Sequence, residues 1–263
     1  MGRRSVPLDD ASRWVFNRLA DDYLARPPYP DALVDRLAAL AGGAGGRVAD
    51  LGAGVGHLAI PLAGRGLSVT AVEPARAMLE VLEARAGSAA GIRVVHATAE
   101  RTGIASGSCD LVVLADAVQW VDPDLAGREA ARLLAPGGAI AVVEPAFART
   151  PFMEGLSALL ARANPKSRPR PPGAVRQLLA LAAAGAPVVE EPFTQDAPLD
   201  DGALAAVLGS LSYAGAALGP AALDAVVSDA LALARAAGGA RFRRDLTLRW
   251  AARRRPRRGR RPA

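Results

Sequence analysis

The sequence concentrates glycines in one short turn, Asp50-Leu51-Gly52-Ala53-Gly54-Val55-Gly56-His57, which follows a predicted strand and opens a predicted helix. Glycines at such a place permit a tight turn and let backbone N–H groups approach a ligand closely. The spacing is GxGxG, because His57 stands where a dinucleotide fingerprint has its third glycine. No Gly-Lys-Ser/Thr follows, which excludes a P-loop. The turn therefore predicts a nucleotide-type site of another kind.

A second candidate anchor is Glu73, at the end of the next predicted strand. A carboxylate at that place can accept hydrogen bonds from both hydroxyls of a ribose. Pro74 and Met78 follow, and a methionine thioether is soft enough to cover one face of an adenine ring. Taken alone, Glu73 is an ordinary solvated strand end and Met78 a core residue. Their combination with the glycine turn favours a nucleoside site.

The elements that must position these residues alternate along the chain. Short β-branched runs predict strands, and the alanine- and leucine-rich runs between them predict helices, which is the order that builds a parallel sheet. The first half predicts strands at 47–51, 68–73, 92–96, 110–115 and 139–144, and helices at 58–63, 75–86 and 124–134. The second half predicts strands at 187–194 and 241–250, paired antiparallel at the sheet edge. Two amphipathic segments, 14–24 and 31–40, come too early to be crossovers and predict a helical lid.

Five pieces of sequence, in the same order and spacing, resemble the class I S-adenosylmethionine-dependent methyltransferases, particularly the small-molecule branch called type 11. They are residues 48–56, 72–79, 97–100, 110–112 and 134–138, and weaker likeness extends the match to about residues 10–252. The resemblance implies an α/β fold with a Rossmann-like, doubly wound seven-stranded sheet, mostly parallel with an antiparallel edge strand, plus the N-terminal helical lid. It also implies S-adenosylmethionine as cofactor.

The resemblance further implies which residues hold that cofactor. Gly52 and Gly54 would approach its methionine part, and Glu73 its ribose. Ala99 and Glu100 would meet the adenine. Tyr23 and Arg26 would close over the methionine carboxylate, or else only pack the N-terminal helices. The full predicted set is Tyr23, Arg26, Asp50, Gly52, Ala53, Gly54, Glu73, Pro74, Met78, Ala99, Glu100 and Ala115.

Three residues are candidates for catalysis: Asp116, His57 and Gln119. Methyl transfer is a displacement in which the protein mainly aligns the acceptor with the methyl group. Asp116 would sit near the sulfonium, at the mouth of the fourth strand. His57 would stay neutral beside a helix N-terminus and be available as a base, although a turn histidine is the simpler interpretation. Relatives often carry histidine where this chain has Gln119, which cannot act as a base but can orient an acceptor.

The expected domain organisation is a single domain over 1–252, with a lid at 10–45, a cofactor-binding half at 46–150 and a substrate-side half at 151–252. A basic tail at 253–263 is expected to be disordered. Its seven arginines exceed the net charge of +6, so the remaining chain is nearly neutral. A terminal charge run is usually solvated, and the alternative is an arm that binds phosphates.

Composition narrows the remaining choices. A single cysteine, Cys109, excludes an internal disulfide and a cysteine-based zinc cluster, and no metal site is expected. Neither a signal peptide nor an apolar run long enough to span a membrane is evident, so the expected compartment is the cytoplasm.

The expected reaction is O-, N- or C-methylation of a small molecule, in bacterial secondary metabolism. The alternative is a non-methylating reaction, such as a cyclisation, on the same cofactor-binding fold. A weaker third hypothesis is methylation of nucleic acid or protein with the tail as docking arm; the lack of an Asn-Pro-Pro-Tyr-type segment after the fourth strand argues against methylation of nucleic-acid bases.

Overall fold

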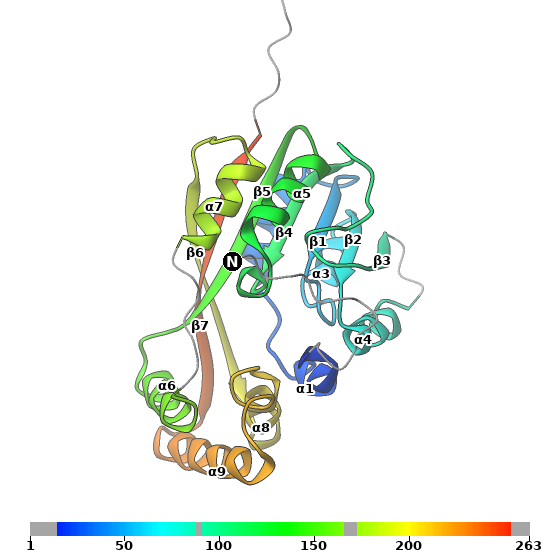
Figure 1. Ribbon diagram of the computed structural model, residues 1–263. Helices are drawn as coiled ribbons and strands as arrows, with labels where there is room; N and C mark the ends of the chain where they lie inside the picture. Colours follow the sequence, from blue (N-terminus) through cyan, green and yellow to red (C-terminus); the bar gives the residue numbers. More distant parts are fainter. Residues whose placement is uncertain (1–14, 88–90, 166–172, 254–263) are drawn as a thin grey trace, which may run out of the picture.

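The computed structural model describes residues 15–87, 91–165 and 173–253. Within them, one sheet of seven strands has the order β3-β2-β1-β4-β5-β7-β6 (Figure 1). The first five strands run parallel, and β7 pairs antiparallel with both β5 and β6. This confirms the predicted Rossmann-like, doubly wound α/β fold. The strands are β1 Arg47–Leu51, β2 Ser68–Glu73, β3 Ile92–His96, β4 Cys109–Ala115, β5 Leu134–Phe147, β6 Val189–Leu199 and β7 Ala240–Ala252.

The two late strands pair antiparallel at the sheet edge, as predicted, and β7 is the strand that runs against the others. β7 lies between β5 and β6, and β6 forms the edge. The reason is burial: β7 buries Phe242, Leu246 and Leu248 on one face and needs neighbours on both sides. Most of β6 is partly or fully exposed, and it contains Pro192 and Pro198, residues that edge strands tolerate because they cannot donate to a ladder.

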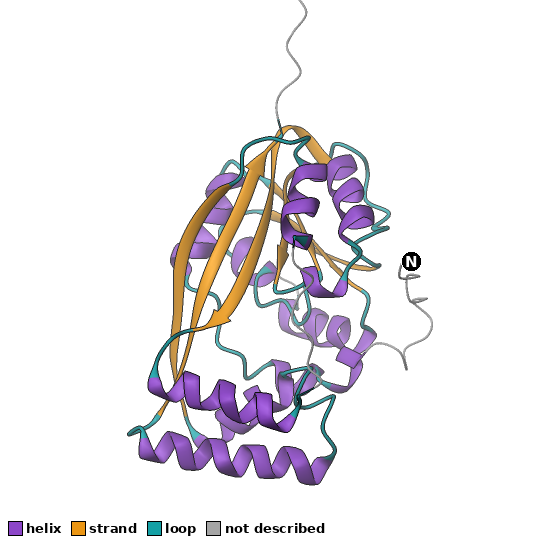
Figure 2. Ribbon diagram, turned by 60° about the vertical axis from the view of Figure 1, so that its left-hand side comes forward, coloured by secondary structure: helices purple, strands orange, loops and turns teal. Residues whose placement is uncertain are grey.

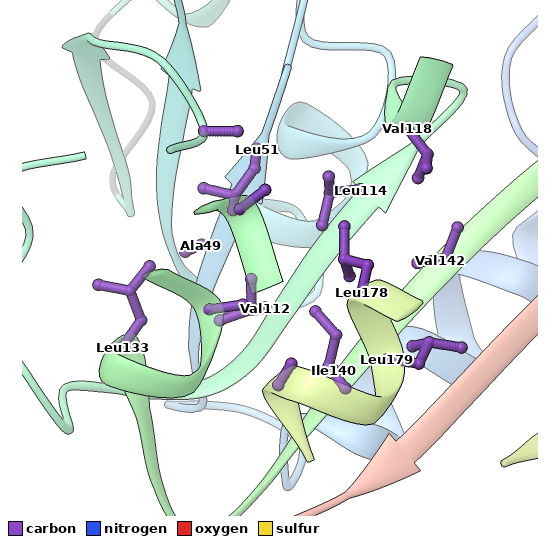
Figure 3. Packing of buried hydrophobic residues seen from close by; sticks show 14 of the residues in the cluster. Ala49, Leu51, Val112, Leu114, Val118, Leu133, Ile140, Val142, Leu178 and Leu179 are labelled. Atoms are coloured by element: carbon purple, nitrogen blue, oxygen red, sulfur yellow. The ribbon is translucent and has the colours of Figure 1, made fainter. Parts of the chain in front are cut away.

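Helices cover both faces of the sheet. On one face α5 (Pro123–Leu133) and α7 (Ala174–Ala182) pack on alternate residues of β1, β4 and β5, as Figure 3 shows for Leu133, Leu178, Val112 and Ile140. On the other face α2 (Asp31–Leu40), α3 (Ala59–Ala63) and α4 (Arg76–Ala86) contribute to a second core. The side-chain alternation of a strand explains why each buried strand supplies both cores.

The N-terminal segment was predicted to be a lid over residues 10–45, and this is wrong for its second helix. Helix α2 is a layer helix, because Leu33, Val34 and Leu37 are fully buried against the sheet. Only the short elements before it, η2 (Val15–Arg18) and α1 (Ala20–Tyr23), lie beside the glycine turn and α4. Residues before 15 lie outside the described residues.

A third apolar cluster lies at the far end of the long strands β5, β6 and β7. Helices α6 (Pro151–Ala163), α8 (Asp201–Ser210) and α9 (Pro220–Ala236) gather there, below the main sheet in Figure 1. Figure 2 shows the three strands running on from the sheet to these helices. The extension carries the first residues of β7 beyond the carboxyl end of β4, where the candidate site lies.

The start of the predicted basic tail is corrected by one residue. Arg253 is fixed to the body, because its backbone N–H donates to the carbonyl of Gly138 and its Nη1 donates to that of Ala131. The remaining tail residues, 254–263, lie outside the described residues.

Candidate cofactor and active site

A cavity of about 380 Å³ lies at the carboxyl ends of β1, β2 and β4, between these strands and the N-terminal segment. Parallel strands that end at one edge of a doubly wound sheet form such a crevice. The cavity brings together every residue that the sequence predicted for the cofactor, together with two of the three catalytic candidates. These lining residues are Tyr23, Arg26, Asp50, Gly52, Ala53, Gly54, His57, Glu73, Pro74, Met78, Ala99, Glu100, Ala115 and Asp116.

The glycine turn is open toward the cavity at Gly54. A Cβ added there would meet only a ring carbon of Tyr23, at 3.9 Å, and its φ of 54° favours glycine. The prediction that the turn presents its N–H groups to a ligand is wrong for Gly52, Ala53 and Gly54, because these groups donate hydrogen bonds within the protein. Gly52 and Ala53 donate to the carbonyl of Val72, and Gly54 donates to a carboxylate oxygen of Glu73. The turn therefore offers a bare backbone surface.

Glu73 is buried, with 5% of its surface exposed. Its Oε2 accepts from the backbone of Gly54 and its Oε1 from that of Ala75, both at 2.9 Å. Burial raises the pKa of this carboxyl to about 7, although the two N–H groups act in the opposite direction. Each carboxylate oxygen keeps a second acceptor position.

Asp50 is the second buried carboxyl of the cavity, with 1% of its surface exposed. Its Oδ2 has no hydrogen-bond partner within the described part of the chain. Burial, and then the nearby charge of Glu73, raise its pKa to about 7. A buried carboxylate oxygen without a donor is costly, so this side of the cavity suits a ligand that brings a donor or a positive charge.

The N-terminal segment closes the cavity with aromatic and cationic side chains. The guanidinium of Arg26 stacks 3.8 Å from the centre of the Tyr23 ring. Arg26 also donates to the hydroxyl and the carbonyl of Ser210, each at 2.9 Å, and through Nη1 to Oδ2 of Asp116 at 3.3 Å. The two interpretations of Tyr23 and Arg26 are thus compatible, because these side chains both pack the segment and line the cavity.

Residues 49–142 match the family model described as a methyltransferase domain. Over 118 residues the chain is 42% identical to an uncharacterized methyltransferase of Mycobacterium tuberculosis, covering 45% of this chain and 46% of that protein. Over 135 residues it is 34% identical to malonyl-[acyl-carrier protein] O-methyltransferase of Geobacter sulfurreducens, covering 49% and 51%. Over residues 49–142 the chain is therefore similar to the S-adenosylmethionine-dependent methyltransferases of class I. Its matches span about half the length of these curated relatives.

Solved structures resemble this chain over most of its length. One assigned as a type II methyltransferase from Anaeromyxobacter dehalogenans is 25% identical, covers 87% of this chain and 97% of its own, and gives a TM-score of 0.59. YcgJ from Bacillus subtilis is 17% identical, with coverage of 86% and 100% and a TM-score of 0.58, and it shows the likeness of fold alone.

The cavity fits S-adenosylmethionine, the cofactor of the similar methyltransferases, in the chemistry of its side chains. S-Adenosylmethionine carries ribose hydroxyls, an ammonium and a carboxylate. Glu73 offers two acceptor oxygens, the unpartnered Oδ2 of Asp50 suits the ammonium, and Arg26 suits the carboxylate. Gly54 leaves space where any other residue would project a Cβ.

His57 lines the cavity, but its side chain is bound to the N-terminal segment. Its Nε2 lies 2.8 Å from the carbonyl oxygen of Tyr23 and must donate, because a carbonyl only accepts. Burial lowers its pKa to about 4, so the ring is neutral at pH 7, as predicted. The cause is desolvation rather than the expected helix dipole. A base with this pKa is weak near neutrality, and the geometry favours a positioning role.

Gln119 was predicted to orient the acceptor, and the structure places it outside the cavity. It lies in the short helix η3 (Val118–Trp120), whose turn directs its amide nitrogen to the carbonyl and to Oδ1 of Asp116, at 2.8 and 3.2 Å. Asp116 itself has a φ of 53°, which non-glycine residues rarely adopt. Gln119 therefore stabilises the unusual backbone that presents Asp116 to the cavity.

Arg244 is a lining residue that sequence reasoning missed. It lies on β7, is only 6% exposed, and donates through Nε to Oε1 of Gln195 at 2.6 Å. Its signal was the strand alternation, because Arg244 occupies the same face as the buried Phe242 and Leu246. A charged residue is rarely buried in a strand unless a partner or a ligand compensates its charge.

Proposed function

We propose that this chain is a methyltransferase, which transfers a methyl group from S-adenosylmethionine to an oxygen, nitrogen or carbon atom of a small molecule, in the cytoplasm and in bacterial secondary metabolism. One observation carries the proposal: residues from the glycine turn, β2, β4 and the N-terminal segment converge on a single cavity that is large enough for a small ligand.

Each end of the cavity has a distinct part in the proposed reaction. When bound, S-adenosylmethionine supplies an electrophilic methyl group and a neutral leaving group. Glu73 accepts hydrogen bonds from the ribose, Asp50 accepts from the ammonium, and Arg26 binds the carboxylate. Met78 and Pro74 line the adenine end, where the carboxylate of Glu100 accepts from the backbone N–H of Asp122.

Asp116 is the residue best placed to act on the acceptor. It follows β4, and its Oδ2 forms an ion pair with Arg26. The ion pair keeps one carboxylate oxygen oriented, so the residue can accept a hydrogen bond from an acceptor hydroxyl or amine and align it. Phe16 and Trp120 also line the cavity and form an edge-to-face pair, with 4.9 Å between ring centres.

The test uses S-adenosylmethionine with a labelled methyl group. We expect label in the product in step with S-adenosylhomocysteine, and unchanged turnover in EDTA. No group of three His, Cys, Asp or Glu side chains suited to a metal occurs in the described ranges. Product without S-adenosylhomocysteine would refute methyl transfer and support the non-methylating alternative. Turnover on nucleic acid alone would support the third hypothesis.

No helix in residues 15–87, 91–165 and 173–253 is long and apolar enough to cross a membrane.

A further inference from the structure

A polar cluster lies at the end of the cavity that β4 and β7 form. Its members are Arg26, Tyr29, Asp116 and Arg244, which all line the cavity. Glu73 ends β2, and three strands separate β2 from β7 in the sheet. The cluster is therefore separate from the carboxylate assigned to the ribose.

Arg244 is held in place but its terminal nitrogens are uncommitted. Gln195 donates its amide nitrogen to the carbonyls of Pro27 and Pro28, at 2.8 and 2.6 Å, so its oxygen must face Arg244 and accept from Nε. Nη1 lies 3.8 Å from Oδ2 of Asp116, too far for a hydrogen bond, and Nη2 has no hydrogen-bond partner in the part of the chain that is described. The fork thus presents two free donors to the cavity.

Within the described residues, Arg244 has no carboxylate at hydrogen-bond distance. Asp116 lies closer to Arg26, at 3.3 Å, than to Arg244, and Arg26 is further bound to Ser210. Burial raises the pKa of Tyr29, which therefore stays a neutral phenol and a possible donor. The one carboxylate near this buried guanidinium among the described residues, Asp116, is shared with Arg26, and an anion between Arg244 and Tyr29 would provide the hydrogen bonds that Asp116 does not.

We propose that Arg244 binds a carboxylate of the methyl acceptor, which is accordingly a small organic monocarboxylate. This inference rests on the methyltransferase function proposed above and specifies its substrate class. A planar guanidinium that offers two nitrogens matches the two oxygens of a carboxylate. A carboxylate places a single negative charge beside Arg244, whereas a phosphate dianion would place two next to Asp116. Gln195 acts as a positioning residue that keeps the fork aimed at the cavity.

The experiment measures binding by calorimetry to protein saturated with S-adenosylhomocysteine, so that the cofactor's own carboxylate site is filled. The probes are straight-chain monocarboxylates from acetate to octanoate, each compared with its primary amide. We expect at least one acid to bind roughly tenfold or more tightly than its amide, because the amide loses the charge-assisted bonds. Arg244→Met should weaken the binding of that acid by roughly 10- to 100-fold.

Three variants serve as controls. Arg244→Lys keeps the charge but not the fork, so we expect an intermediate loss that does not depend on Arg244→Met folding. Arg243→Met removes the exposed neighbouring arginine and should change nothing. Arg26→Met should weaken the binding of S-adenosylhomocysteine but not that of 5′-methylthioadenosine, which lacks the amino-acid part. The Arg244 variants should change the affinity for either ligand by no more than about twofold.

The outcomes separate the two proposals. If S-adenosylhomocysteine does not bind, the proposed function fails. If it binds, and no acid binds better than its amide, the carboxylate proposal alone fails. The proposal is also overturned if Arg244→Met weakens the binding of S-adenosylhomocysteine but not that of 5′-methylthioadenosine, because Arg244 would then bind the amino-acid part of the cofactor.

Discussion

Two buried carboxyls, Asp50 and Glu73, make cofactor affinity depend on pH near neutrality. Burial raises the pKa of each to about 7 in the free protein. In the proposed binding mode, ribose hydroxyls and an ammonium donate to the ionised carboxylates, so the ligand favours the charged forms and lowers both pKa values. Affinity for S-adenosylhomocysteine should therefore be greatest above about pH 8 and fall as the pH drops through 7.

The magnitude follows from the ionised fraction. A carboxyl with a pKa of about 7 is roughly one-tenth ionised at pH 6 and nine-tenths ionised at pH 8, so one group weakens binding by about tenfold, or ~1.4 kcal/mol, between these values. If both groups must ionise, the loss approaches ~100-fold. Without ligand the sign is opposite: each raised pKa stabilises the protonated native state, so the free energy of unfolding should fall as the pH rises from about 5 toward 7.

Calorimetry with S-adenosylhomocysteine from pH 6 to 8 measures the effect directly. Titrations at pH 6.5 in two buffers of different ionisation enthalpy should show protons released on binding. Glu73→Gln cannot ionise and should remove about tenfold of the pH dependence, and Asp50→Asn is the matched variant for the other carboxyl. Affinity that is constant over this range, with no proton release by the unchanged protein, would refute the reasoning.

The remaining predictions concern packing, alignment and the tail. Gly54→Val places a side chain in the cavity and also puts a β-branched residue at a φ of 54°, so it should weaken the binding of S-adenosylhomocysteine by roughly 100-fold and lower the free energy of unfolding, while circular dichroism shows that the variant is still folded at the assay temperature. Phe242→Ala removes a fully buried ring from the cluster of α6, α8 and α9, and urea denaturation should show a loss of about 3 to 5 kcal/mol. Asp116→Asn should slow turnover about 10²- to 10⁴-fold if Asp116 removes a proton, and much less if it only aligns the acceptor. Deletion of residues 254–263 should leave turnover and cofactor affinity unchanged, and a loss confined to nucleic-acid substrates would contradict that expectation.

The sequence by itself determined the parts of this protein that depend on local order along the chain. Strand, glycine turn and helix follow one another directly, so the Asp50 to His57 segment and Glu73 could be assigned to one edge of a parallel sheet. Those residues do line one cavity. The antiparallel pairing of the two late strands was predictable too, because the alternation of apolar and charged residues in β7 is a local pattern.

Tertiary structure decided how distant side chains face one another. Arg244 lies at a buried position that the alternation predicts, but its orientation comes from Gln195, 49 positions earlier, and from the carbonyls of Pro27 and Pro28. Gln119 is adjacent to the site in sequence, yet the turn of η3 directs it to the backbone of Asp116 instead of the cavity. Such contacts depend on packing between elements that are far apart in the chain, and no periodicity within either element specifies them.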